Sequence, residues 1–170
     1  MLIGMMNNPQ NAVLNEINFA GENAFDYLDL TLEPPGAYIL PGQVSEIRSL
    51  LESYNMGVIG HYAWYMPIDS PFDQVRNAAC QECIEQMRVF ADIGAEKITL
   101  HAGFSYPDRF FSYDRKLALW CDSMDRLSVA ARELGVMLMM ENVAGRKDQF
   151  RILRDLLKRY PDLGFHLDIG

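Results

Sequence analysis

Residues 136–145 have the sequence VMLMMENVAG, and the order of apolar and polar residues in this segment indicates the fold class. The first five residues are all apolar, so a strand formed by them is expected to be buried on both faces. Strands of this kind occur in parallel sheets that are covered by helices. Glu141 and Asn142 follow the apolar run and mark the carboxyl end of the predicted strand.

Similar apolar runs alternate along the chain with longer segments of helical periodicity, which predicts an α/β protein. One of these helices is expected to open near Ser70 and Pro71, because a serine followed by proline is typical of a helix start. The predicted strands are residues 2–6, 25–35, 56–67, 97–103, 136–145 and 163–170. The predicted helices are residues 12–24, 42–55, 70–95, 113–135 and 148–162.

A β/α barrel is the expected arrangement of these units, rather than an open doubly wound sheet. The first predicted strand is followed by MNNPQNA, residues 6–12, which has no glycine and therefore lacks the phosphate-binding turn of a dinucleotide fold. Each unit has about 28 residues, so eight units would need roughly 220. We therefore expect residues 1–170 to form one domain that contains six of the eight units of a TIM-type barrel, with open sheet edges that invite pairing between copies.

The composition excludes several functional classes. A chain of 170 residues with 49% hydrophobic and 22% charged residues is typical of one soluble globular domain. A net charge of -8 repels phosphate backbones and anionic membranes, which makes nucleic acid an unlikely partner. The sequence has no signal-peptide pattern and no apolar run of about 18 residues, so we expect a cytoplasmic protein without a membrane segment.

The three cysteines, Cys80, Cys83 and Cys121, are expected to be structural. A redox-active CxxC pair has its first thiol at a helix N-terminus, but the CQEC segment lies within a long predicted helix. A zinc site would need a second cysteine pair, which the sequence lacks. Too few cysteines are present for a disulfide framework, in agreement with a reducing compartment.

Polar residues stand at the carboxyl ends of successive predicted strands, where barrel enzymes carry their chemistry. A single histidine in such a place is usually a hydrogen-bonded core residue. Several ionisable groups at the same rim would converge, and their carboxylates would repel one another without a cation between them. The sequence therefore predicts a divalent-metal site among the strand-end residues Glu33, His61, His101, Glu141, Asn142 and Asp168.

Carboxylate oxygens and imidazole nitrogens suit Mn²⁺, Zn²⁺, Co²⁺ or Fe²⁺ better than Ca²⁺, and Mg²⁺ also accepts carboxylates. No thiolate is expected among the ligands. His166 lies two residues before Asp168 and so points to the same face of its strand. It is expected to be a structural residue or a hydrogen-bonding partner of a metal ligand.

Four segments together resemble the xylose isomerase-like TIM barrels. This superfamily contains sugar-phosphate isomerases and epimerases, and also the endonuclease IV type of apurinic DNA-repair enzyme. Each segment alone is a weak motif, but their order, one at each of four successive strands, is fairly specific, and the resemblance extends over nearly the whole chain. The segments are GHYAWYMPIDSP (residues 60–71), ITLHAG (98–103), MMENVAG (139–145) and HLDIG (166–170).

The resemblance implies that Glu141 and Asp168 bind the metal, and its endonuclease branch implies the same for His61 and His101. It also implies an isomerase or epimerase that removes a proton beside a carbonyl and passes through an enediolate, with Glu141 as base as well as ligand. The family supplies further site residues after the DIG segment and from strands seven and eight. None of these is present here, so the short form is expected to be weakly active or inactive.

The substrate expected from the resemblance is a small carbohydrate. Its predicted contacts are Glu33, His61, Trp64 and Asn142. The aromatic residues Tyr62, Trp64, Tyr65 and Phe104 would shape the sugar pocket or simply pack at the rim.

Two alternatives stay open. A metal-dependent phosphodiesterase acting on abasic DNA is favoured by His61, His101 and the ENVAG segment, but the acidic composition disfavours it. The basic residues near the mouth, Arg109, Arg146 and Lys147, are expected to be solvated surface residues. The other alternative is a non-catalytic barrel remnant that binds a partner through its open sheet edge.

Overall fold

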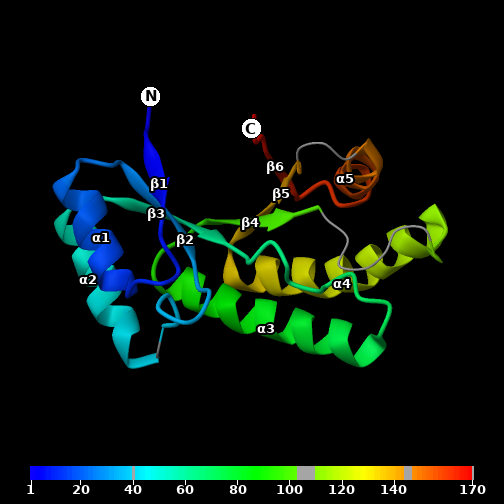
Figure 1. Ribbon diagram of the computed structural model, residues 1–170, viewed down its shortest axis with the longest axis horizontal. Coiled ribbons are helices and arrows are strands. Elements are labelled where there is room, and N and C mark those ends of the chain that lie inside the picture. The colour runs from blue at the N-terminus through cyan, green and yellow to red at the C-terminus, as the bar shows by residue number, and fades with distance from the viewer. Residues whose placement is uncertain (40, 103–109, 144–146, 170) are drawn as a thin grey trace.

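The computed structural model describes residues 1–39, 41–102, 110–143 and 147–169 (Figure 1). The strands are β1 (Gly4–Met6), β2 (Tyr27–Thr31), β3 (Gly57–His61), β4 (Lys97–His101), β5 (Met137–Glu141) and β6 (Gly164–His166). The helices are α1 (Val13–Glu22), α2 (Val44–Ser53), α3 (Asp73–Asp92), α4 (Tyr113–Leu134) and α5 (Lys147–Arg159), with a 3₁₀ turn over Pro41–Gln43.

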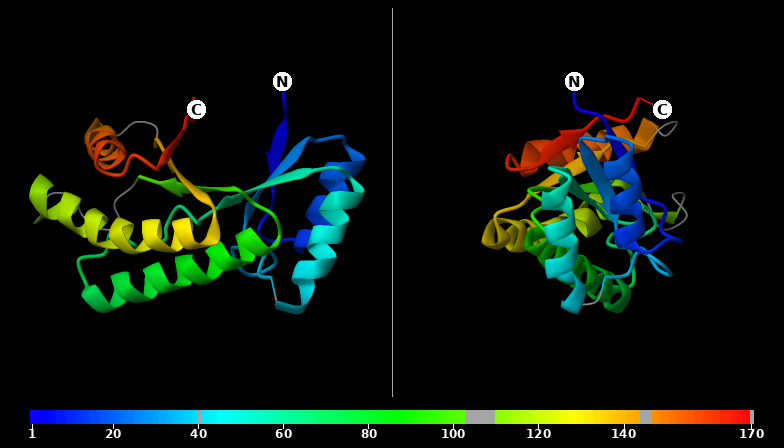
Figure 2. Two further views of the ribbon diagram at one scale, coloured as in Figure 1. Left: turned by 180° about the vertical axis from the view of Figure 1, so that it is seen from behind. Right: turned by 90° about the vertical axis from the view of Figure 1, so that its left-hand side faces the viewer.

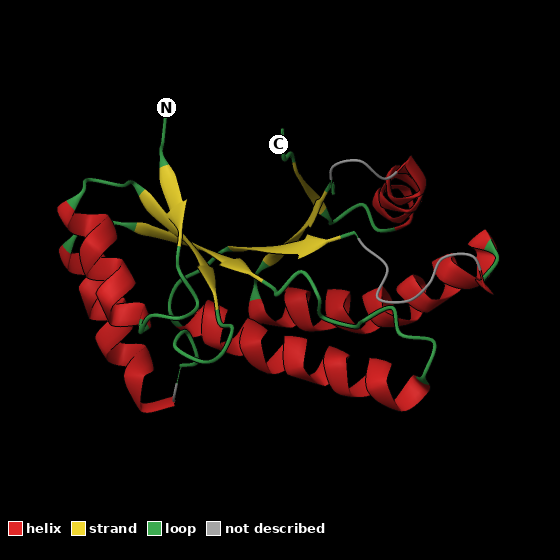
Figure 3. Ribbon diagram, in the orientation of Figure 1, coloured by secondary structure: helices red, strands yellow, loops and turns green. Residues whose placement is uncertain are grey.

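The described strands form one parallel sheet in the order β1-β2-β3-β4-β5-β6. Each strand pairs with the next one along the chain, as in a barrel, whereas a doubly wound sheet reverses its strand order. The helices lie on the outer side of the curved sheet (Figures 2 and 3). The predicted architecture is therefore confirmed, and the chain has the fold of six consecutive units of a TIM-type barrel.

The two faces of each strand have different roles. Alternate residues such as Leu28, Leu30, Ile98 and Leu100 are at most 2% exposed and belong to the hydrophobic core. Their neighbours in sequence point to the inner face, because successive side chains of a strand alternate between faces. The inner face therefore receives the polar residues of the strands.

The expectation that residues 136–140 are buried on both faces is only partly right. Leu138 and Met140 are buried, but Met137 is 44% exposed and Met139 is half-buried. The described sheet has edges at β1 and β6, so its inner face is not closed by a complete ring of strands there. The apolar residues of this run that face the helices are therefore buried, and those that face the inner side of the sheet are partly exposed to solvent.

Helix α4 begins and ends close to its predicted bounds, whereas α3 begins later than predicted. The Ser112 side chain accepts a hydrogen bond from the Arg115 backbone at the start of α4, and Gly135 ends the helix with φ 70°. Helix α3 starts at Asp73 after Phe72, which offers no side-chain cap. Ser70 instead accepts a hydrogen bond from the Phe72 backbone within the preceding turn.

All three cysteines are buried and free, as predicted. Burial raises the pKa of the Cys83 thiol, which disfavours the reactive thiolate. In the described part of the chain, no helix has the length and apolar character needed to cross a membrane.

Gly60 allows β3 to lie close against α3. A Cβ atom at this position would stand 2.7 Å from Cγ of Phe90, whose ring is fully buried. We expect Gly60→Ala to lower the free energy of unfolding by about 1–3 kcal/mol, because the ring has no room to move. Urea unfolding measures this change.

Gly57→Ala is the matched control on the same strand. Its Cβ would meet Cβ of Tyr27 at 3.4 Å, an ordinary contact. Equal stability of the two variants would contradict the proposed clash at Gly60.

Candidate metal centre

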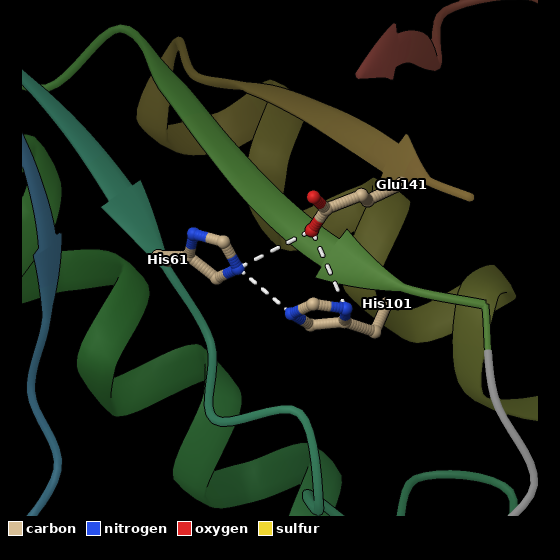
Figure 4. Close-up of side chains that lie close together, drawn as sticks. All are labelled: His61, His101 and Glu141. Carbon is tan, nitrogen blue, oxygen red and sulfur yellow. Dashed lines mark hydrogen bonds and ion pairs between the residues drawn. The ribbon is translucent and has the colours of Figure 1, made fainter. Parts of the chain in front are cut away.

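Three side chains meet at the carboxyl ends of neighbouring strands: His61 of β3, His101 of β4 and Glu141 of β5. Each is the last residue of its strand and points to the inner face (Figure 4). His101 is directly paired with Glu141 in the sheet, while His61 is paired with Thr99. The potential ligand atoms of the three residues lie within 4.8 Å of one another.

The two imidazole rings are in direct contact. Nε2 of His61 lies 2.8 Å from Nε2 of His101, and the ring centroids are 4.9 Å apart. Oε2 of Glu141 lies 3.4 Å from Nε2 of His61 and 3.3 Å from Nδ1 of His101. Among the described residues, this buried oxygen accepts no well-aligned hydrogen bond.

Asp29 of β2 joins the group from the other side of His61. Nδ1 of His61 is 3.1 Å from both carboxylate oxygens of Asp29. The sequence prediction missed this residue because it lies within a strand rather than at its end. The alternation of Asp29, Thr31 and Glu33 in residues 25–35 was the available signal, since residues two apart share a strand face.

The hydrogen-bonding pattern of His61, His101 and Glu141 favours an additional positive charge in the cluster. A carboxylate only accepts hydrogen bonds, so a neutral His61 that faces Asp29 carries its proton on Nδ1. A neutral His101 then donates from Nε2 to His61 and presents the lone pair of its Nδ1 to Glu141. Two electron-rich atoms face each other at 3.3 Å in that arrangement. One further proton, or a metal cation, removes the repulsion.

The pKa values follow the same logic. Burial alone would lower the pKa of His61, but Asp29 and Glu141 outweigh it and raise the pKa to about 9. Burial and the neighbouring histidines lower the pKa of His101, although Glu141 opposes them. Burial would raise the pKa of Glu141, yet the surrounding histidines lower it. In the absence of a metal, His61 therefore carries the additional proton at neutral pH.

These residues fit a divalent cation. They offer one buried carboxylate oxygen without a well-aligned hydrogen bond and two imidazole nitrogens, a donor set that suits Zn²⁺, Mn²⁺ or Co²⁺. His61 and Glu141 are only 4% and 6% exposed, so a bound ion would be partly shielded from solvent.

The charge on His61 predicts how stability depends on pH. Its pKa of about 9 in the fold exceeds the ordinary value of 6.5, so its stabilising effect is complete below pH 6.5 and is lost as the pH rises through 9. We expect a loss of up to about 3 kcal/mol over this range. Urea unfolding in the presence of a chelator measures it, with His61→Gln as control. A stability difference between the two proteins that does not narrow at high pH would contradict this assignment.

Comparison with known proteins identifies the family. A sequence model described as "Xylose isomerase-like TIM barrel" matches residues 17–170. The chain belongs to this family. No curated protein sequence matches it.

Several solved structures share this xylose isomerase-like TIM barrel fold. D-psicose 3-epimerase from Clostridium cellulolyticum, solved with D-tagatose, has a TM-score of 0.82 and 14% identity, over 99% of this chain and 63% of that one. The IOLI protein with a bound zinc atom has a TM-score of 0.76 and 11% identity, over 97% and 62%. Endonuclease IV from Thermus thermophilus has a TM-score of 0.70 and 17% identity, over 99% and 62%. The chain thus spans less than two thirds of each of these structures.

Asp168, predicted to bind the metal in this xylose isomerase-like barrel, is outside the three-residue cluster of the described chain. It follows β6, and its backbone is held by the side chain of Asn142. The Asn142 amide donates to the Asp168 carbonyl at 2.7 Å and accepts from its N–H at 2.9 Å. Asn142 therefore positions the segment that carries Asp168, and its predicted contact with a substrate stays a prediction.

His166 lies at the edge of the cluster. Its Nδ1 is 3.1 Å from the Thr99 hydroxyl and 3.9 Å from Oε1 of Glu141. Its expected role as a structural residue or as a partner of a metal ligand stays a prediction.

Glu33 and two aromatic residues form a separate group on the loops after β2 and β3. Glu33 accepts a hydrogen bond from Thr31 at 2.9 Å, and its hydrogen bond with Tyr65 raises the pKa of that tyrosine. Trp64 packs edge-on against Tyr65 and is 73% exposed. The exposed indole is available to a ligand, so the substrate contacts predicted for Glu33 and Trp64 stay open.

The pocket role expected for Tyr62 is wrong. Tyr62 is fully buried, packs against Phe90 and donates its hydroxyl to the Cys83 carbonyl at 2.8 Å. It follows His61 by one residue and therefore points to the helix side of the sheet. Phe104, Arg109 and Arg146, together with the side chain of Lys147, lie outside the described part of the chain.

Proposed function

We propose that the protein is a divalent-metal-dependent isomerase or epimerase of a small sugar or sugar phosphate. One observation carries the proposal: His61, His101 and Glu141 converge at the carboxyl ends of three neighbouring strands, around a buried carboxylate oxygen that lacks a well-aligned hydrogen bond. The catalytic sites of TIM barrels lie at this end of the sheet. The sugar epimerases among the similar structures support the reaction class.

Glu141 is the proposed base. Its lowered pKa keeps the carboxylate ionised at neutral pH, so it is ready to accept a proton from carbon beside a substrate carbonyl. Oε2 faces the histidine pair, while Oε1 points toward His166 and is the oxygen we assign to proton transfer. A divalent ion held by His61, His101 and Glu141 would stabilise the negative charge that develops on the substrate oxygens.

Glu33, Trp64 and Tyr65 are the proposed substrate contacts. A carboxylate accepts hydrogen bonds from sugar hydroxyls, and an exposed indole face packs against the apolar side of a sugar ring. The hydrogen bond from Tyr65 holds Glu33 in place. Asp168 and Asn142 remain further candidates for metal and substrate contacts beside this group.

Hydrolysis of abasic DNA is the second candidate. The two imidazole donors in the cluster favour it, and endonuclease IV is among the similar structures. A net charge of -8 opposes it, because DNA affinity depends on cationic side chains that neutralise phosphates.

Metal titration followed by deuterium exchange tests the proposal. Elemental analysis and calorimetry with Zn²⁺, Mn²⁺ and Co²⁺ should give one tightly bound ion for each chain. The loaded protein is then incubated in deuterated water with ketohexoses and ketopentose phosphates, and proton NMR records exchange beside the carbonyl. This readout needs only proton abstraction, so it detects a chain that cannot complete the isomerisation.

The outcomes separate the candidates. Exchange that is lost in Glu141→Gln supports the isomerase or epimerase. Cleavage of an abasic oligonucleotide without sugar exchange supports the phosphodiesterase. Absence of metal binding overturns both and favours a non-catalytic module.

We also propose that two copies of the chain associate through their open sheet edges. In the described chain β1 pairs only with β2, and β6 only with β5, so both edges carry unpaired backbone groups. Ile3 and Phe165, beside or on these edge strands, are 55% and 50% exposed. Sedimentation velocity should show a dimer that Phe165→Lys weakens, and a monomer at all concentrations would contradict this proposal.

We also propose that the protein is cytoplasmic. The free cysteines are in keeping with this location, because the cytoplasm keeps thiols reduced.

A further inference from the structure

Among the described residues, the Asp29 carboxylate contacts the metal centre through His61. Both of its carboxylate oxygens lie 3.1 Å from Nδ1 of His61, the ring nitrogen that faces away from His101 and Glu141. We propose that Asp29 is a positioning residue that fixes the tautomer and the orientation of His61, so that the lone pair of Nε2 is directed at a bound divalent cation. This inference rests on the metal centre of the proposed function.

The strands place Asp29 for this contact. Asp29 lies on the inner face of β2, and in the β2–β3 register it is paired with Ile59, two residues before His61. The His61 ring therefore reaches back along the sheet to meet it. The side chains are 6% exposed for His61 and 20% for Asp29, so the contact is largely sheltered from solvent. A sheltered contact of this kind constrains a ring more than an exposed ion pair does.

The chemistry of imidazole explains why this contact matters. A neutral histidine carries its proton on one nitrogen, and only the other nitrogen can bind a metal. A carboxylate at Nδ1 keeps the proton there and leaves Nε2 free. Metal-binding histidines commonly have such an outer carboxylate partner, which also increases their basicity.

His101 has no equivalent contact among the described interactions. Its Nε2 faces His61 and its Nδ1 faces Glu141, so both of its nitrogens point into the cluster. Glu33, two residues after Thr31, bonds instead with Thr31 and Tyr65. Within the described cluster, His61 is therefore the histidine that an outer carboxylate orients. Removing Asp29 should change the orientation and tautomer of His61 and leave those of His101 unchanged.

Asp29→Ala and Asp29→Asn test the inference in the full chain, with Glu22→Gln as the control. The control neutralises an exposed carboxylate at the end of α1 that no described contact joins to the metal centre. Zinc affinity is measured by competition calorimetry, and the His61 tautomer by long-range proton–nitrogen NMR of the zinc-loaded protein. Thermal unfolding followed by circular dichroism verifies that each variant folds.

We expect Asp29→Ala to weaken zinc binding about 10–100-fold, the usual effect of losing an outer-shell partner. Its His61 should also lose the single Nδ1–H signature that the wild type shows. Asp29→Asn should have a smaller effect, because the amide oxygen still accepts from Nδ1–H. Glu22→Gln should bind zinc as the wild type does.

Other outcomes would overturn either the positioning role of Asp29 or the metal centre itself. Wild-type affinity in Asp29→Ala, or weaker binding with an unchanged His61 tautomer, overturns the positioning role but leaves the metal centre intact. If Asp29→Ala does not fold, Asp29→Asn decides: a loss of zinc affinity larger than that of Glu22→Gln supports the role, and an equal loss overturns it. A wild-type chain that binds no zinc overturns the metal centre, and this inference with it, so the two failures are distinguishable.

Discussion

Replacing Glu141 with alanine is expected to abolish divalent-metal binding by this chain. Glu141 supplies the carboxylate of the three-residue cluster, and its Oε2 lies within 3.4 Å of both imidazole rings. Without it, the described cluster would keep two histidines in contact and no carboxylate to offset the charge of a cation. The affinity should fall by more than about 100-fold, since even the loss of an outer-shell partner costs about 10–100-fold.

Calorimetric titration with Zn²⁺ and Mn²⁺ measures this loss, and two further variants sharpen it. Glu141→Gln keeps the shape but not the charge, and should lose most of the affinity as well. Glu22→Ala, at the end of α1, removes a distant carboxylate and should bind as the wild type does. Retained affinity in Glu141→Ala would show that the ion binds elsewhere.

The metal affinity of Asp168→Ala should be measured in the same titrations, because it decides whether Asp168 is a ligand. The resemblance predicts that Asp168 is a ligand, whereas the described cluster contains His61, His101 and Glu141 without it. A loss of affinity comparable to that of Glu141→Ala would make it a fourth ligand. A small effect would leave the described cluster as the whole centre.

Among the substitutions considered, Phe90→Ala should lower the free energy of unfolding the most. Phe90 is fully buried in α3, lies directly against Gly60 of β3, and packs edge-on against Tyr62 with ring centroids 6.0 Å apart. Removing the ring leaves a cavity between α3 and β3, and such substitutions cost about 3–5 kcal/mol. Urea unfolding measures the change.

Phe19→Ala is the control for this variant. Phe19 lies in α1 and is 54% exposed, so its removal should change the free energy of unfolding by less than about 1 kcal/mol. Because Phe90 supports the strand that ends at His61, Phe90→Ala should also weaken metal binding. Similar stability of the two variants would contradict the central place of Phe90 in the core.

The order of strands and helices could be predicted because each element has its own periodicity, and parallel strands that follow one another in a barrel place their carboxyl ends together. That rule also places His61, His101 and Glu141 in one group from the sequence alone. It worked for these residues because each one ends its strand.

The rule about strand ends does not say to which face of the sheet a side chain points, and the predictions that depended on the face failed. Asp29 lies within β2 and was missed, although it shares a face with Thr31. Tyr62 adjoins His61 in sequence but points to the opposite side, into the core. The partial exposure of Met137 and Met139 depends on how far the sheet closes, which a local pattern does not contain.

The additional proton of His61 has a consequence for metal loading. It has the same electrostatic role that a cation would have, and the strands that carry these side chains pack in the hydrophobic core, so we expect the site to keep its arrangement without a bound ion. An incoming ion exchanges with a proton and does not have to gather ligands from an unfolded chain. The protein should therefore be stripped of metal and reloaded while it stays folded, unlike small zinc domains whose folding depends on the ion.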